Sequence, residues 1–120
     1  MDLLEVFKDS DDLVEYPAEA TIFTEGIEGN YMYVMMEGEA VISLHGKVLA
    51  TVLPGEILGE MALINSEIRS ATVTAKTDCV LARIDQSSFE SLIRHVPEFT
   101  QHVMNVLANR LQVAFEMIEH

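Results

Sequence analysis

The residues of this chain whose types and spacing could do chemistry lie in one segment, Gly59 to Ala71. The segment begins with Gly59-Glu60, continues through residues of helix-forming type, and ends with Arg69-Ser70-Ala71. A glycine lets the backbone approach a ligand closely, the N–H groups at the start of a helical turn attract anions, and an arginine can pair with two phosphate oxygens. The segment therefore predicts an anion site.

Glu60 does not fit an anion site by itself, because a carboxylate repels a phosphate. A carboxylate that lines such a site must face a hydrogen-bond donor, and a sugar hydroxyl is the simplest one. A phosphate together with a sugar hydroxyl indicates a nucleotide.

The net charge of the chain limits the classes of molecule that it is expected to bind. Its 120 residues carry 20 acidic and 7 basic side chains, which give a formal net charge of −13 at pH 7. A field of this sign repels nucleic acid and anionic membrane surfaces, so neither is expected to bind. Screening limits surface charges to about 8 Å at physiological salt. One well-placed arginine can therefore dominate its own surroundings, and we expect Arg69 to matter more than the total charge.

The cysteine and histidine content indicates the compartment and argues against a metal site. Cys79 is the only cysteine, which excludes an intramolecular disulfide and fits a reducing compartment. No apolar run approaches the ~20 residues of a membrane span, and the N-terminus is acidic where a signal peptide needs basic residues. The four histidines lack the His-x-His spacing of a metal-binding barrel, so no metal is expected. We predict a cytoplasmic protein.

The elements that must position the anion segment follow from the pattern around it. Short β-type stretches, separated by turns such as Glu37-Gly38 and Pro54-Gly55, fill the middle of the chain. Because no helix-length crossover separates them, they favour an antiparallel β jelly-roll, a double-stranded β-helix barrel. The predicted strands are 21–23, 31–36, 40–44, 48–53, 72–75 and 79–84.

Helices are predicted at both ends of the chain. Leu3, Leu4 and Phe7 share one helical face, and Ser10 can cap a second short turn over residues 13–14. We therefore expect a mainly β domain with short N-terminal helices and two C-terminal helices. Asp85 is a suitable cap for the first C-terminal helix, and Pro97 separates it from the last one. The expected organisation is one domain, 1–120, with a helical segment at 1–15, a barrel at 16–84 that includes the anion segment 58–71, and helices at 85–120.

The last helix carries two apolar stripes. A helix that lies on a barrel needs only one such stripe, so the second needs another cover. A partner helix is the simplest cover, and a symmetric homodimer through residues 103–118 is favoured. In the alternative, the barrel and the N-terminal helices absorb both stripes. The stripes are Met104, Leu107, Leu111, Ala114 and Ile118, and Val103, Val106, Val113 and Met117.

Several segments, in their order along the chain, resemble the cyclic nucleotide-binding domain family. That family includes bacterial catabolite activator proteins, kinase regulatory subunits and nucleotide-gated channels. The segment 58–71 looks like the family's phosphate-binding cassette, and the resemblance covers nearly the whole chain. The other segments are Phe23-Thr24-Glu25-Gly26, residues 33–40, Leu53-Pro54-Gly55-Glu56 and residues 75–79.

The resemblance implies a role for each residue of the cassette. Arg69 would pair with the cyclic phosphate, where a lysine would not be equivalent because it lacks the planar fork. Glu60 would accept a hydrogen bond from the ribose 2′-hydroxyl. The remaining phosphate and ribose contacts would come from Gly59, Met61, Ala62, Ser70 and Ala71.

The base would lie between strands of the barrel and the last helix. By similarity the barrel wall is Ile42, Leu49 and Val52, which would also fit an ordinary core. Ala114 and Phe115 stand where the activator proteins carry a Thr-Ser pair that touches adenine. Phe115 or Arg110 could stack on the base instead.

We therefore predict a stand-alone, non-catalytic sensor domain that binds a 3′,5′-cyclic mononucleotide, cyclic AMP ahead of cyclic GMP. It needs no cofactor, closes its last helix over the ligand and signals to a protein partner that the sequence does not define. Two alternatives stay open: a protein-interaction module with a vestigial pocket, and a cupin-like small-molecule enzyme.

Overall fold

The computed structural model describes residues 1–64, 69 and 71–118, and it consists of two compact units. The sheet unit is Asp2–Gln86, and the helical unit is Ser87–His120 together with Met1. Each unit is considered by itself below.

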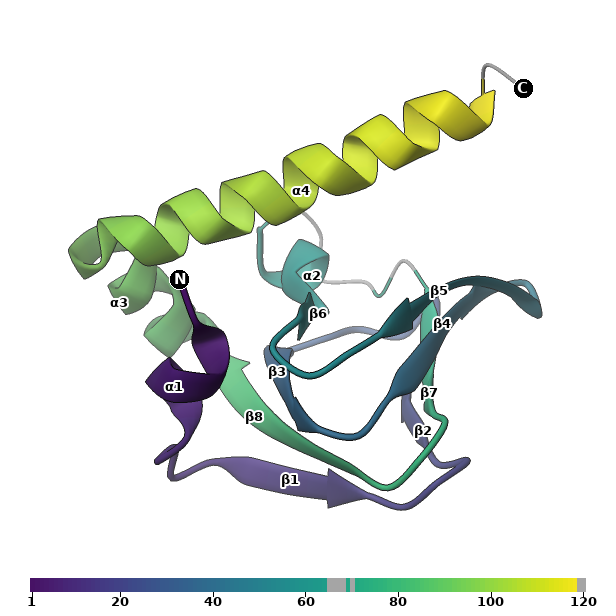
Figure 1. The fold of residues 1–120 in the computed structure, drawn as a ribbon, viewed down its shortest axis with the longest axis horizontal. Coiled ribbons are helices and arrows are strands. Elements are labelled where there is room, and N and C mark those ends of the chain that lie inside the picture. The colour runs from purple at the N-terminus through teal and green to yellow at the C-terminus, as the bar shows by residue number, and fades with distance from the viewer. Residues whose placement is uncertain (65–68, 70, 119–120) are drawn as a thin grey trace. The chain divides into compact units, whose positions relative to one another are not determined.

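The sheet unit holds the β structure of the described residues in two four-stranded antiparallel sheets (Figure 1). The chain passes repeatedly from one sheet to the other, which is the jelly-roll arrangement, although the two sheets do not close into a continuous barrel. The predicted fold class is confirmed. The first sheet runs β1 (Leu13–Tyr16), β8 (Cys79–Asp85), β3 (Tyr31–Glu37), β6 (Ile57–Leu58), and the second runs β2 (Thr21–Phe23), β7 (Thr72–Ala75), β4 (Ala40–Leu44), β5 (Lys47–Val52).

The six predicted strands all form, with ends that agree to within one residue. The helical turn expected over residues 13–14 is wrong, because these residues belong to β1, where Val14 pairs with Leu81 of β8. Ser10 does not cap a helix there, and its hydroxyl accepts a hydrogen bond from the Asp12 backbone N–H at 3.2 Å. Exposed and half-buried side chains alternate along β1, as expected for an edge strand with one face toward the solvent. The two-residue strand β6 is too short to leave a sequence pattern.

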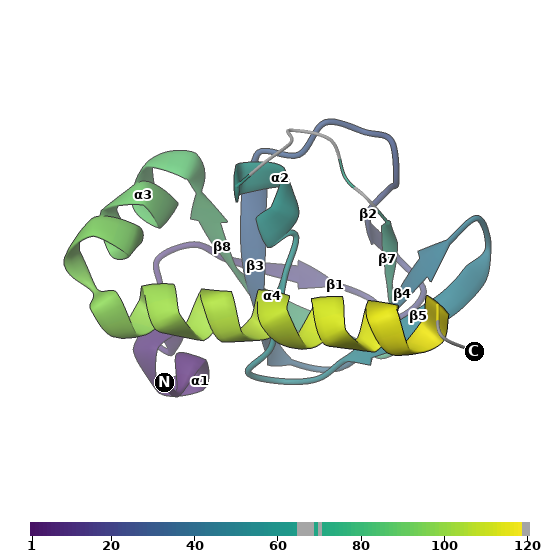
Figure 2. The ribbon, with the colours of Figure 1, turned by 90° about the horizontal axis from the view of Figure 1, so that it is seen from above.

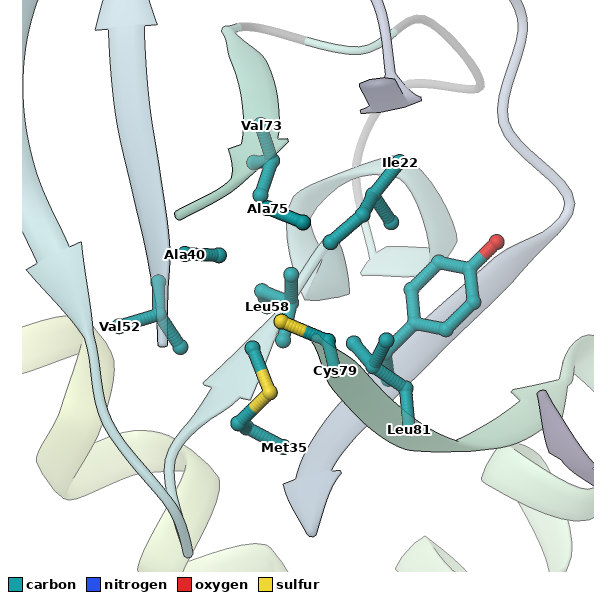
Figure 3. Close-up of a cluster of buried hydrophobic side chains, with 10 residues drawn as sticks. Ile22, Met35, Ala40, Val52, Leu58, Val73, Ala75, Cys79 and Leu81 are labelled. Carbon is teal, nitrogen blue, oxygen red and sulfur yellow. The ribbon is translucent and has the colours of Figure 1, made fainter. Parts of the chain in front are cut away.

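Apolar side chains from both sheets meet in one buried cluster (Figure 3). Cys79 belongs to this cluster, as expected for a small core residue, and burial raises the pKa of its thiol. The cluster fixes how the two sheets face each other, since each contributes half of it. Its members are Tyr33, Met35, Leu58, Cys79 and Leu81 from the first sheet, and Ile22, Ala40, Val52, Val73 and Ala75 from the second.

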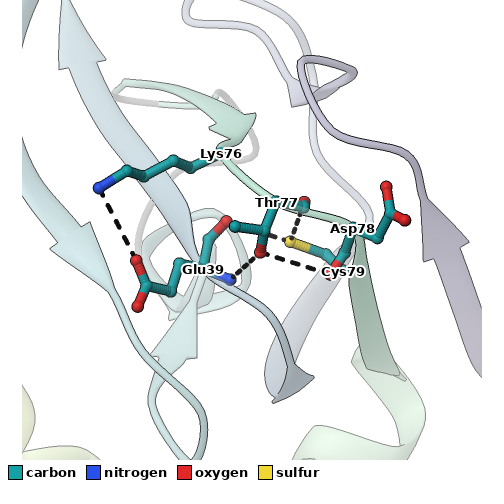
Figure 4. Close-up of polar contacts among 5 residues, drawn as sticks. All are labelled: Glu39, Lys76, Thr77, Asp78 and Cys79. Carbon is teal, nitrogen blue, oxygen red and sulfur yellow. Dashed lines mark hydrogen bonds and ion pairs between the residues drawn. The ribbon is translucent and has the colours of Figure 1, made fainter.

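Two turns meet at one corner of the sheet unit (Figure 4). The Glu39 backbone N–H donates to the Thr77 hydroxyl at 2.9 Å, and the Glu39 carbonyl accepts from the Lys76 N–H at 2.8 Å. The Cys79 thiol also donates to the Glu39 carbonyl, at 3.3 Å. Gly38 makes this approach possible, because its φ is +91° and a Cβ atom there would collide with the Asp78 carbonyl oxygen.

The helices of the described residues complete the two units. In the sheet unit, α1 (Leu3–Phe7) is capped by Asp2, whose Oδ1 accepts from the Leu4 N–H at 3.1 Å, and α2 (Glu60–Ile64) follows β6. The helical unit contains most of α3 (Gln86–His95) and all of α4 (Pro97–Ile118), which Figure 2 shows as one continuous helix.

Within the helical unit, two contacts join its helices. The rings of Phe89 and Phe99 meet edge to face at 6.1 Å between centroids, and the Thr100 hydroxyl donates to the Ile93 carbonyl at 3.0 Å. No helix of the described residues is both long enough and apolar enough to cross a membrane.

The corner at Gly38 provides a test of the fold. We expect Gly38→Ala to lower the free energy of unfolding more than Gly46→Ala does. Both glycines have positive φ, +91° and +79°, which costs an alanine about 1–2 kcal/mol. A Cβ at position 46 meets nothing within 4 Å, whereas at position 38 it meets backbone, which adds about 1–3 kcal/mol. Urea unfolding followed by circular dichroism measures the difference, and equal midpoints for the two variants would contradict this account.

Candidate functional site

Arg69 lies between α2 and β7, and its side chain points into the sheet unit. The residue is only 5% exposed. Its Nη1 donates to the Gly59 carbonyl oxygen at 2.9 Å and its Nη2 donates to the Tyr31 carbonyl oxygen at 2.6 Å. The guanidinium therefore links the residue that precedes α2 to the first residue of β3.

The main chain of Arg69 is also fixed. Its carbonyl accepts a hydrogen bond from the Gly26 N–H at 2.9 Å, and its N–H donates to the Ile27 carbonyl at 2.8 Å. These two bonds tie Arg69 to the turn that follows β2. Next to them the Glu25 N–H donates to the Thr72 hydroxyl at 3.0 Å, at the start of β7.

Two aromatic rings lie beside the guanidinium group. The Cζ atom of Arg69 is 4.2 Å from the centroid of the Phe23 ring and 5.8 Å from that of Tyr33. The two rings stack on each other at 6.1 Å, with 23° between their planes. Phe23 belongs to the second sheet and Tyr33 to the first, so both sheets contribute an aromatic face to the cation.

Two glycines leave room for the same group. A Cβ atom at Gly29 would collide with Nε and Cζ of Arg69, and one at Gly59 would lie 2.6 Å from Nη1. Gly59 also has a φ of +79°, a conformation that glycine adopts without strain. The prediction that Gly59 allows a close approach is consistent with this geometry, although the group that approaches here is the guanidinium of Arg69.

The charge of Arg69 is compensated by neutral groups. Burial lowers the pKa of Arg69, and Tyr33 opposes that shift; burial, followed by the effect of Tyr16, raises the pKa of Tyr33. A buried cation without an anionic partner is costly, so an anion that reached this group would be favoured. Among the described residues, Arg69 is not part of the ion pairs Lys8–Glu5, His45–Glu25, Lys76–Glu39 and Arg83–Asp12.

Glu60 is the other buried charged residue of the described part of the chain, at 0% exposed. It is the first residue of α2 and directly follows Gly59, the residue whose carbonyl receives the Arg69 hydrogen bond. A buried carboxylate therefore directly follows the glycine whose carbonyl accepts from the buried guanidinium. This pairing joins a group that can accept from a hydroxyl to a group that can donate to a phosphate.

The other predicted cassette residues are only partly described. Ala71 is half-buried just before β7. Met61 and Ala62 belong to α2, but their side chains lie outside the described structure, as does the whole of Ser70. The structure thus brings Gly59, Glu60 and Arg69 together and leaves the other expected contacts undescribed.

The predicted base-binding residues fall in both units. Val52 is 2% exposed within the core cluster and Ile42 packs against that cluster, whereas Leu49 on β5 is 47% exposed. Phe115, 57% exposed, and Arg110 lie on α4 in the helical unit. Ala114 lies on the same helix, with a side chain outside the described structure.

Sequence reasoning missed the groups that hold Arg69. Tyr31 and Tyr33 are two apart on a strand, which places both rings on one face of the sheet and was a usable signal for an aromatic surface there. The Tyr31 carbonyl that accepts from Arg69 leaves no signal in the side-chain pattern. Phe23 and Gly29 gave no signal, since their distance from Arg69 in the sequence hides the contact. These residues are recognised only once the two sheets are assembled.

The model of the cyclic nucleotide-binding domain family matches residues 13–96. This range is more than half of the chain, so the protein belongs to the cyclic nucleotide-binding domain family, as the resemblance implied. The solved structure of the Thermus thermophilus catabolite activator protein superimposes with a TM-score of 0.82 at 29% identity, over 90% of this chain and 53% of that one.

Curated relatives support the same assignment. The chain is 39% identical over 80 residues to the cGMP-dependent protein kinase isozyme 2 of Drosophila melanogaster, which covers 67% of this chain and 7% of the kinase. It is 30% identical over 110 residues to the cAMP-activated global transcriptional regulator CRP of Salmonella typhimurium, which covers 87% of this chain and 52% of the regulator. The chain thus spans about half of one relative and a small part of the other.

Proposed function

We propose that this domain binds a 3′,5′-cyclic mononucleotide at Arg69 and Glu60 and acts as a non-catalytic sensor. The main support is the burial of Arg69, a cation that is 5% exposed and belongs to none of the ion pairs of the described residues. Membership of the cyclic nucleotide-binding domain family supports the choice of ligand.

We also propose a reducing, cytoplasmic compartment for the protein. The reason is that the chain contains a single cysteine.

In this proposal Arg69 receives the cyclic phosphate without giving up its internal bonds. A guanidinium carries five N–H donors in one plane, and two of them serve the carbonyls of Gly59 and Tyr31. Further N–H groups of Arg69 would serve phosphate oxygens, and Ser70 and Ala71 would add donors, as the family resemblance implies. Glu60 accepts a hydrogen bond from the ribose 2′-hydroxyl. The buried carboxylate therefore favours a ligand that carries this hydroxyl.

We propose cyclic AMP ahead of cyclic GMP as the ligand. The relative that covers the larger share of this chain is named for activation by cAMP, and the other is named for cGMP. Ile42, Leu49 and Val52 would form one wall around the base, and Arg110, Ala114 and Phe115 the other. The lack of a Thr-Ser pair at positions 114–115 makes stacking, which tolerates either purine, the main contact.

We further propose that α4 closes over the occupied site and that the same helix supports a homodimer. A ligand shifts such an equilibrium only through contacts that differ between the two states. Apolar side chains in the C-terminal half of α4 are exposed. An exposed apolar surface of this kind is typical of an interaction site, either with the bound ligand or with a second copy of the chain. The exposed side chains are Leu111, Val113, Phe115 and Ile118.

Removal of the Arg69 side chain should abolish most of the nucleotide affinity. Loss of a buried charged partner costs about 2–5 kcal/mol, so Arg69→Ala should weaken cyclic AMP binding well over tenfold, measured by calorimetry. Glu60→Gln is the matched comparison, and it should have a milder effect because an amide oxygen still accepts from a hydroxyl. Titration of the unaltered chain with cyclic AMP, cyclic GMP and 5′-AMP ranks the ligands. Unchanged affinity in Arg69→Ala would place the ligand elsewhere.

Closure of α4 should be visible by hydrogen exchange. Saturating cyclic nucleotide should slow amide exchange over residues 98–118, because a helix that packs over a ligand opens less often. The exchange of β3 and β8 in the same sample is the internal reference. Protection of 98–118 that stays the same with and without nucleotide would refute the closing movement while leaving binding intact.

A charge on the exposed face of α4 should separate the dimer. Sedimentation velocity should report a dimer for the unaltered chain and a monomer for Leu111→Glu, because a buried carboxylate without a partner is costly. Asn109→Glu, another exposed position on the same helix, is the matched control and should remain dimeric. A monomer for the unaltered chain at concentrations well above the micromolar range would contradict the dimer.

A further inference from the structure

The Phe23 ring lies against the Arg69 guanidinium, and the proposed nucleotide contacts do not use it. Its ring centroid is 4.2 Å from Cζ of the guanidinium. An aromatic face contacts a guanidinium through its π surface and leaves the N–H groups, which lie in the guanidinium plane, free to point sideways. This contact therefore holds the cation without consuming a donor.

The position of Phe23 depends on an irregularity in β2. Thr21 pairs with Thr74 of β7, but Phe23 pairs with Val73, so β2 contains one extra residue over this interval. A bulge of this kind redirects the side chain that follows it. The first sheet supplies the second ring, Tyr33, which stacks on Phe23.

The turn after β2 completes the surroundings of Arg69. Gly26 and Ile27 hold its main chain at 2.9 and 2.8 Å, and the missing Cβ of Gly29 leaves the space that Nε and Cζ occupy. One short segment, 23–29, thus supplies a ring, two backbone hydrogen bonds and an opening. We call the Phe23 ring, the carbonyls of Tyr31 and Gly59 and the opening at Gly29 the Arg69 seat.

We propose that Phe23 and Gly29 are positioning residues that set the nucleotide affinity through Arg69 without touching the ligand. The seat fixes the guanidinium before a ligand arrives, so binding does not have to order a long, flexible side chain. It also ties the guanidinium to Gly59, next to the carboxylate of Glu60, and thereby sets the spacing between the phosphate and ribose contacts. This inference depends on the proposed function for its ligand.

A matched pair of ring deletions tests the seat. Phe23→Leu removes the ring beneath Arg69, and Tyr31→Leu removes a ring of the same unit that lies 4.6 Å from Cζ of Arg83. In the ligand-free protein, the side-chain NMR signals of Arg69 should lose their ring-current shift only in Phe23→Leu. Those of Arg83 should lose theirs only in Tyr31→Leu. Cyclic AMP affinity should fall about 3- to 30-fold in Phe23→Leu. It should stay unchanged in Gly46→Ala, where the new Cβ meets nothing within 4 Å.

Gly29→Ala gives a second test of the seat that leaves the Phe23 ring in place. The nearest atoms to its new methyl group all belong to the Arg69 side chain, which can move aside. The variant should shift the Arg69 signals and weaken cyclic AMP binding, and it should lower the stability because the displaced guanidinium loses its contacts with the Tyr31 and Gly59 carbonyls. Gly46→Ala is the control, since it should lower stability and keep the affinity.

The results separate the seat from the proposed function. Arg69 signals that stay in place in both Phe23→Leu and Gly29→Ala, or affinities that stay the same or increase, would overturn the positioning role. An unaltered chain that binds neither cyclic nucleotide would overturn the proposed function and the effect on affinity together. In that case the spectra of the ligand-free variants still decide whether the ring holds the arginine.

Discussion

A guanidinium group that is 5% exposed must find acceptors and contact surfaces for its charge inside the protein, and Arg69 finds them in two carbonyl oxygens and two aromatic rings. This requirement explains features that otherwise look unrelated. Gly59 must present its carbonyl without a Cβ, Gly29 must leave space, and β2 must carry a ring at its end. A neutral environment compensates the charge only in part, which is why the same group suits an anionic ligand.

The jelly-roll topology is what brings these groups together. The Tyr31 carbonyl and the Tyr33 ring come from β3 in the first sheet, whereas Phe23 comes from β2 in the second. Apart from the β4–β5 hairpin, consecutive strands of the chain lie in different sheets, so residues from β2 and β3 become neighbours across the core. The buried cluster that includes Tyr33, Val73 and Leu58 holds the two sheets in their positions face to face. The site is therefore a property of the whole sheet unit and not of the cassette alone.

The fold class and the strands could be predicted from the sequence, because turn glycines separate stretches of β-type residues. Arg69 and Glu60 could be singled out because both are charged residues in a short helical segment between predicted strands. The failure at β1 has a local cause: Ser10 looks like a helix cap, but pairing of Leu13 and Val14 with β8 decides their conformation. The Arg69 seat was beyond prediction, since it depends on an extra residue in β2 and on packing between sheets. The exposure of Leu49 likewise depends on which strand lies at the edge of the second sheet.

That edge strand, β5, carries the longest open row of backbone hydrogen-bonding groups among the edge strands of the described residues. Such a row invites another chain to extend the sheet. The β4–β5 pairing shifts register between Ile42 and Ser43, and the strand opens on Lys47. A register irregularity and a cation at the start of the strand both discourage pairing with a strand of another molecule. The hairpin thus carries, on its own edge strand, the features that oppose fibrillar self-association.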